Sequence, residues 1–279
     1  MPIISSLIGA GTGAYAAQYI VKRNKDLDDR LKEVRSTNAA VTLAYGITDR
    51  FLNEKHQIVK PLVDLFTDER QRFEDAHKPP GPRGEIRFNL DLRSYNLNRT
   101  PIEQLEEIVF NQISAPTRPM SVVSILARTI QGLEAFVQER NELIREFRAV
   151  QKAEKALDAF AYFGLVTDKG ADQRYSSTLS NLADYTDDAI HFSKMIGDDL
   201  RKYAIALKDT LPSRTKPLAP IIVSADFSKR DDVMPNPEKY KDYETMFRAN
   251  RVLGRGIWTA EFEALALAQF ETTAEFQSA

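Results

Sequence analysis

Apolar residues recur along most of this chain at intervals of three or four positions, which is the pattern of one face of an α-helix. The exception comes first: residues 3–21, IISSLIGAGTGAYAAQYIV, contain no charged side chain. A basic cluster follows at once and consists of Lys22, Arg23 and Lys25. From Asp26 the helical periodicity begins, so the sequence predicts one unbroken helix from the charge-free segment to about Asn53.

The same periodicity predicts several further helices. They are expected at about 61–78, 100–114, 119–147, 153–163, 176–211, 240–247 and 259–270. The helix expected at 61–78 ends before Pro79, because the Pro-rich stretch 78–84 cannot continue a helix. Thr100, Pro101 and Glu103 form a candidate capped helix start. The four–three rhythm of the helix expected at 119–147 is typical of antiparallel bundle packing or of a short coiled coil.

Two short segments read as strands instead. Residues 85–92, EIRFNLDL, alternate strictly between polar and apolar positions, and the apolar run 221–223 offers a pairing partner. The expected fold is therefore mainly α: a bundle of long antiparallel helices with at most a minor two-stranded β element, preceded by an N-terminal apolar helix. We expect residues 22–279 to form a single helical domain behind residues 1–21.

Composition narrows the functional classes. The chain has 279 residues, 43% hydrophobic and 28% charged, as expected for a folded protein and not for a disordered one. The net charge of -2 and the interleaved charges offer no basic field for nucleic acid. Cysteine is absent, which excludes disulfides, thiolate catalysis and cysteine-based metal sites.

The favoured interpretation of residues 3–21 is a single-pass membrane anchor. Nineteen helical residues span about 28 Å, close to the hydrocarbon thickness of a bilayer. The basic cluster on the C-terminal side predicts that the following bundle lies in the cytoplasm. Gly9 and Gly13 form a small-xxx-small pair, so self-association through this helix is expected as well.

Three other interpretations of the segment remain open. It could pack in the core of a soluble cytoplasmic bundle, where glycine and alanine also allow close contact. Ala14-Tyr15-Ala16 fits a signal-peptide cleavage pattern, although no basic residue precedes it. Residues 9–14 match G-x-G-x-x-A, a dinucleotide-binding turn, which requires a strand at residues 2–8.

Candidate chemistry is sparse. The chain lacks a G-x-S-x-G elbow, a Walker A sequence and an H-E-x-x-H motif. Two carboxylate–histidine pairs have the i, i+3 spacing of di-iron helical bundles: Glu74 with His77, and Asp188 with His191. A locally acidic face on the 176–211 helix could attract a partner or a cation, or simply be solvated; it consists of Asp184, Asp187, Asp188, Asp198 and Asp199.

These observations favour a non-enzymatic structural or interaction protein. The expected molecule is a helical scaffold tethered to the cytoplasmic face of a membrane, with a protein partner or a second copy, no cofactor and no nucleic acid. One alternative is a carboxylate-rich metalloenzyme built on the two pairs. The other is a helical ligand sensor, which predicts an apolar pocket with a few convergent polar groups between helices.

Overall fold

The computed structural model of the chain describes residues 2–78, 87–153, 158–167, 170–243 and 245, with side chains from residue 17 onward. The chain divides into two compact units, Met1–Pro235 and Asn236–Ala279. The fold is mainly α, as the periodicity predicts. A single domain over 22–279 stays a prediction, and the helix expected at 259–270 lies outside the described residues.

The first unit begins with a helical rod. Helix α1 (Pro2–Glu54) is continuous, which confirms the predicted unbroken helix. A π-helical turn, η1 (Lys55–Val59), joins it to α2 (Lys60–His77). Pro61 lacks the N–H that an α-helix needs, and the wide turn that precedes it lets the rod continue past this position.

Three helical segments follow along the rod. Helix α3 (Ile102–Glu107) passes into η2 (Ile108–Gln112), and α4 (Thr117–Lys152) and α5 (Ala159–Phe163) come next. Thr100 does not cap α3; its neighbour Arg99 pairs with Glu103 at 3.0 Å, so the expected capping box is absent.

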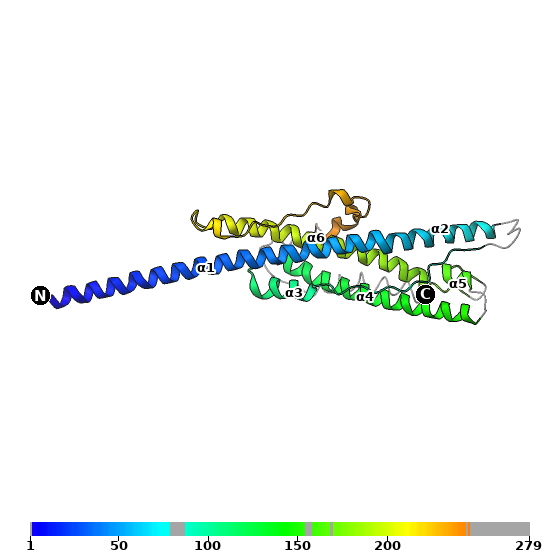
Figure 1. The fold of residues 1–279 in the computed structure, drawn as a ribbon, viewed down its shortest axis with the longest axis horizontal. Coiled ribbons are helices and arrows are strands. Elements are labelled where there is room, and N and C mark those ends of the chain that lie inside the picture. Colours follow the sequence, from blue (N-terminus) through cyan, green and yellow to red (C-terminus); the bar gives the residue numbers. More distant parts are fainter. Residues whose placement is uncertain (1, 79–86, 154–157, 168–169, 244, 246–279) are drawn as a thin grey trace. The chain divides into compact units, whose positions relative to one another are not determined.

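Helix α6 (Arg174–Asp209) is the centre of the bundle and packs against both α1 and α4 (Figure 1). It runs antiparallel to α1, because Lys55 pairs with Asp187 whereas Glu33, earlier on α1, accepts from Tyr203. The shared core consists of the apolar faces of these helices, including Val34, Val41, Ala44, Leu126, Ile144, Leu182, Ile190 and Ile196.

Two glycines allow the closest contacts of α6 with its neighbours. The ring of Tyr45 on α1 occupies the space that a Cβ of Gly197 would need. The ring of Tyr185 on α6 likewise lies against Gly132 of α4. Large aromatic rings can therefore sit between helix backbones at these two crossings.

The predicted strands do not form in the part of 85–92 that is described, residues 87–92, or in 221–223. Residues 87–101, which we call the strap, and residues 221–223 have no strand structure, and the described β pairing is one isolated bridge between Thr167 and Gly170. Phe88, Leu90 and Leu92 of the strap are half-buried and alternate with the exposed Arg87 and Asn89, since one side of this extended segment lies on helices instead of on a second strand.

Candidate functional site

The charge-free segment is helical throughout, because α1 begins at Pro2. The strand required at residues 2–8 by the dinucleotide-binding interpretation is absent, so that interpretation is wrong. Gly9 and Gly13 lie on this helical backbone, and their side-chain positions fall outside the described part. The N-terminal part of α1 extends beyond α4 and α6 of the same unit (Figure 1).

Where side chains of this segment are described, they are exposed. All residues from 17 to 26 are exposed, including the basic cluster of Lys22, Arg23 and Lys25. Tyr19, Ile20 and Val21 have 59%, 57% and 68% of their surface accessible. Among the described side chains of α1, which start at residue 17, Leu31 is the first buried one, at 7%. Burial in the bundle core, the competing interpretation, therefore does not hold for residues 17–21.

By length and hydropathy, a helix other than the start of α1 could also cross a membrane. Among the described residues, α4 contains an 18-residue window with a mean hydropathy of 1.3, apolar enough to cross a membrane. Half of that window, 50%, is buried inside the unit, as is usual for a core helix.

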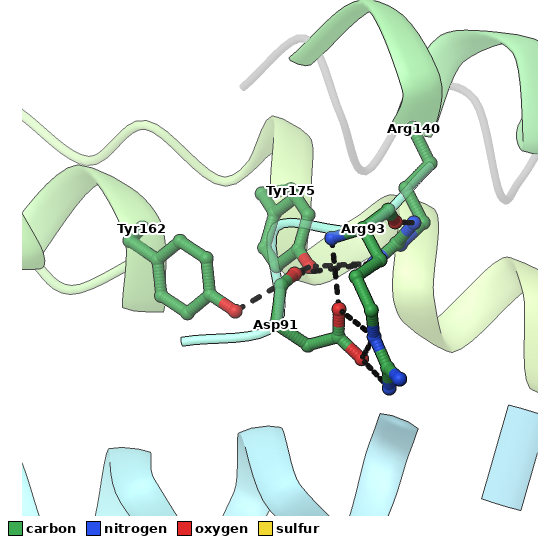
Figure 2. Close-up of polar contacts among 5 residues, drawn as sticks. All are labelled: Asp91, Arg93, Arg140, Tyr162 and Tyr175. Atoms are coloured by element: carbon green, nitrogen blue, oxygen red, sulfur yellow. Dashed lines mark hydrogen bonds and ion pairs between the residues drawn. The ribbon is translucent and has the colours of Figure 1, made fainter. Parts of the chain in front are cut away.

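The strap is held to the bundle by a buried arginine. Arg140 of α4 has 1% of its surface accessible. Its Nη1 donates to the carbonyl oxygen of Arg93 at 2.7 Å, and its Nη2 to that of Asp91 at 3.2 Å (Figure 2). Nη2 also lies 3.4 Å from the hydroxyl of Tyr175, which belongs to α6. The guanidinium thus joins the strap, α4 and α6.

Neighbouring side chains continue this fastening along the strap. Asn141 accepts from the N–H of Tyr95 at 3.2 Å and donates to its carbonyl at 2.7 Å. Arg50 of α1 donates to the carbonyls of Asn98 and Arg99. Side chains of α1 and α4 therefore satisfy backbone groups for which a strand ladder would otherwise be needed.

The charged groups around Arg140 hold the strap in place and are not arranged to transfer a proton. The carboxylate of Asp91 pairs with Arg93 at 2.7 Å, and the hydrogen bonds from Arg93 are the main cause that lowers the pKa of Asp91. Burial raises the pKa of Tyr162 and of Tyr175, whose hydroxyls lie 3.4 Å apart, so both stay neutral. Arg140 also lies over the ring of Tyr95 at 5.5 Å, a cation–π contact.

Beside the strap lies an open groove of about 480 Å³. Its lining consists of Leu65, Asn89, Leu90, Asp91, Leu92, Arg93 and Arg148. The ligand-sensor hypothesis predicts an apolar pocket with a few convergent polar groups between helices, and it stays a prediction. This groove opens at the surface between α2, α4 and the strap.

The two predicted metal-binding pairs lie far apart. Asp187, next to Asp188, pairs with Lys55 at 2.6 Å, and Glu74 lies 19 residues further along the rod, about 28 Å away. Glu74 pairs with Arg70, and His77 bonds the Phe73 carbonyl at 2.8 Å. In the part of the chain that the structure describes, no three histidine or carboxylate side chains converge as metal ligands would.

His191 occupies a partly buried position on α6, beside the ring of Phe192. Burial, assisted by the charge of Lys194, lowers the pKa of His191 to about 4. The imidazole is therefore neutral at physiological pH. Its partner in the predicted pair, Asp188, lies on the same helix.

The acidic face of α6 is largely used for contacts between helices. Asp199 forms an ion pair with Arg118 of α4. Asp198 accepts from Tyr45 of α1 at 2.8 Å and pairs with Lys194 at 2.7 Å. Together with the Lys55–Asp187 pair, these bonds orient α6 between its two neighbours.

Arg140 is the residue that the sequence analysis missed. The apolar positions of α4 follow the rhythm Leu126, Ile130, Leu133, Val137, Ile144, Phe147, and Arg140 fills the place between Val137 and Ile144. The sequence did contain a signal for this site: a charged residue stands at a core position of an otherwise regular apolar stripe. Because a buried arginine needs several hydrogen-bond acceptors, such a position indicates a polar contact inside the bundle.

Comparison with protein-family models, with curated proteins and with solved structures finds no match to this chain. Its function must be argued from the features above. Two of them stand out: the exposed apolar helix that continues into the bundle, and the strap fastened by Arg140.

Proposed function

We propose that this protein is a non-enzymatic interaction protein, a helical bundle tethered to the cytoplasmic face of a membrane by residues 3–21. The observation that carries the proposal is the exposure of Tyr19, Ile20 and Val21 on a helix that continues into the bundle core. Large apolar side chains in water cost about 25 cal/mol for each Å² exposed, and insertion into lipid removes this cost.

The length and flank of the segment support a spanning helix. Residues 3–21 form about 28 Å of helix, which suits a hydrocarbon core of ~30 Å. Lys22, Arg23 and Lys25 are exposed directly after it, where they can lie among lipid headgroups. This distribution of basic residues supports a position of the bundle on the cytoplasmic side.

The continuity of α1 supports the tethering role. No loop separates the anchor from the bundle, because α1 is helical from Pro2 to Glu54. From Leu31 onward its apolar face packs in the bundle, chiefly against α6. The membrane would therefore fix the position of the whole first unit and present its helix faces to a protein partner or to a second copy.

The proposal is tested by fractionation of cells that express the full-length chain, followed by a carbonate wash. We expect the protein in the washed membrane pellet. The double variant Ala10→Arg/Ala14→Arg should move to the soluble fraction, because a charge at the centre of a span costs about 2.5–3.5 kcal/mol.

The matched control is Ala39→Arg, which adds a charge at an exposed position of the same helix within the bundle. It should stay in the membrane pellet. Recovery of the unmodified chain entirely in the soluble fraction would overturn the proposed function.

A further inference from the structure

The segment after α6 exposes large apolar side chains. Residues 212–221, PSRTKPLAPI, which we call the end loop, contain three prolines and the short helix η3 (Lys216–Leu218). Within this loop Leu218 has 61% and Ile221 has 89% of its surface accessible. Two large apolar groups so exposed within four residues are a candidate contact surface.

Contacts with α1 and α6 hold the backbone of the end loop in place, so Leu218 and Ile221 are exposed in a fixed conformation of the loop. Ala219 is buried in one cluster with Leu31 of α1. Lys208 donates to the carbonyl of Pro220 at 2.8 Å, and the N–H of Val223 donates to Asn38 of α1 at 2.8 Å. These contacts fix both sides of Ile221 while its side chain points into solvent.

The end loop lies at the end of the unit from which α1 extends (Figure 1). Leu31, which contacts the loop cluster, is ten residues beyond Val21, the last residue of the charge-free segment, or about 15 Å along the helix. The headgroup layer on each side of a bilayer is about 5–8 Å thick. With residues 3–21 in the membrane and α1 upright, the level of Leu31 lies about 7–10 Å outside the headgroup layer, so the end loop reaches the lipid surface when the bundle tilts towards it.

The charges around the loop fit an anionic surface. Lys202 and Arg214 are exposed, and Lys216 and Lys208 are half-buried. Asp209 is the one acidic residue within 202–221, and it pairs with Lys216 at 3.3 Å. A basic excess of this kind is attracted to anionic lipid. Basic and apolar groups together are the combination that interfacial membrane contacts use.

We propose that the end loop is a second membrane contact, which inserts Leu218 and Ile221 into the headgroup region of an anionic bilayer. This inference rests on the proposed tether. Two contacts, the anchor and the loop, would fix the tilt and the rotation of the bundle on the membrane, which a single helix cannot do.

The absence of cysteine makes a direct test possible. Ile221→Cys is labelled with an environment-sensitive fluorophore, and the full-length chain is reconstituted into phosphatidylcholine vesicles with and without phosphatidylglycerol. The matched control is Val166→Cys, an exposed apolar loop position at 77%. It precedes the start of α6, about 54 Å from the end that leads into the end loop.

We expect a blue shift at position 221, and quenching by spin-labelled lipid, at least several-fold stronger than at position 166. The effect should be larger with phosphatidylglycerol. With a label at Ser213→Cys instead, the double variant Leu218→Ser/Ile221→Ser should lose most of the quenching while the protein still floats with the vesicles.

Three results would overturn the inference. If the protein floats with vesicles but quenching is equal at 221 and 166, the end loop does not contact the membrane, whereas the proposed tether is retained. Protein that does not float removes both. A blue shift at 221 that grows with protein concentration in the absence of vesicles assigns the tip to a second copy of the chain.

Discussion

At the residue scale, the behaviour of this protein depends on a few polar side chains inside an apolar bundle. Arg140 replaces an apolar residue of the α4 stripe and supplies donors to two strap carbonyls. His191 on α6 is kept neutral by burial, which lowers its pKa to about 4. Both groups make the stability of the bundle sensitive to single substitutions.

Replacement of Arg140 by methionine should release the strap. The carbonyls of Asp91 and Arg93 would lose their buried donors, at a cost of about 1–3 kcal/mol. Urea denaturation should show this loss, and hydrogen exchange should show faster exchange at the N–H of Tyr95. Arg128→Met, an exposed position on the same helix and away from the groove beside the strap, is the control and should change stability by less than about 0.5 kcal/mol. Equal stability and exchange in the two variants would contradict the fastening role.

His191 should make the bundle less stable in mild acid. The unfolded histidine has a pKa of about 6.5, so below that pH the unfolded chain binds a proton that the folded chain excludes. Stability is therefore complete above about pH 6.5 and falls towards pH 4, by about 2 kcal/mol at pH 5. His191→Gln should remove this part of the pH dependence in urea titrations, whereas the exposed His56→Gln should not. Parallel pH profiles for wild type and His191→Gln would refute the assignment.

At the element scale, the helices could be predicted from the sequence because their apolar faces repeat over many turns. The strands could not, because the alternation in the strap arises from contact with helix side chains and looks like a sheet pattern locally. The same limit applies to the candidate site. Spacing within one helix suggested the pair Glu74/His77, but only the antiparallel register of α6 shows how far it lies from His191.

The contact of α1 with α6 gives a matched pair of glycine substitutions. Gly197→Ala should destabilise the bundle by about 1–3 kcal/mol, because the new Cβ collides with the ring of Tyr45. Gly46→Ala, with no neighbour within 4 Å, should stabilise it by up to about 1 kcal/mol through helix propensity. Thermal melts followed by circular dichroism compare the two. The same sign of change in both variants would show that the crossing is not as close as described.

At the scale of the whole first unit, one helix connects the proposed membrane segment to the bundle core. Helix α1 leaves the bundle at Leu31 and is exposed from residue 26 back to residue 17. The end loop lies at the same end of the unit. The proposed membrane beside this end would cover the exposed apolar side chains of both α1 and the end loop.

The most direct test of the tether is the depth of residues 3–21 in a bilayer. A spin label at Ala14→Cys in the full-length chain, reconstituted into phosphatidylcholine and phosphatidylglycerol vesicles, reports its access to oxygen and to a water-soluble nickel chelate. Ala39→Cys, exposed on the same helix, is the control. Our account predicts that position 14 is reached by oxygen and shielded from nickel, while position 39 is open to nickel. Equal access of nickel to both positions would contradict the membrane tether.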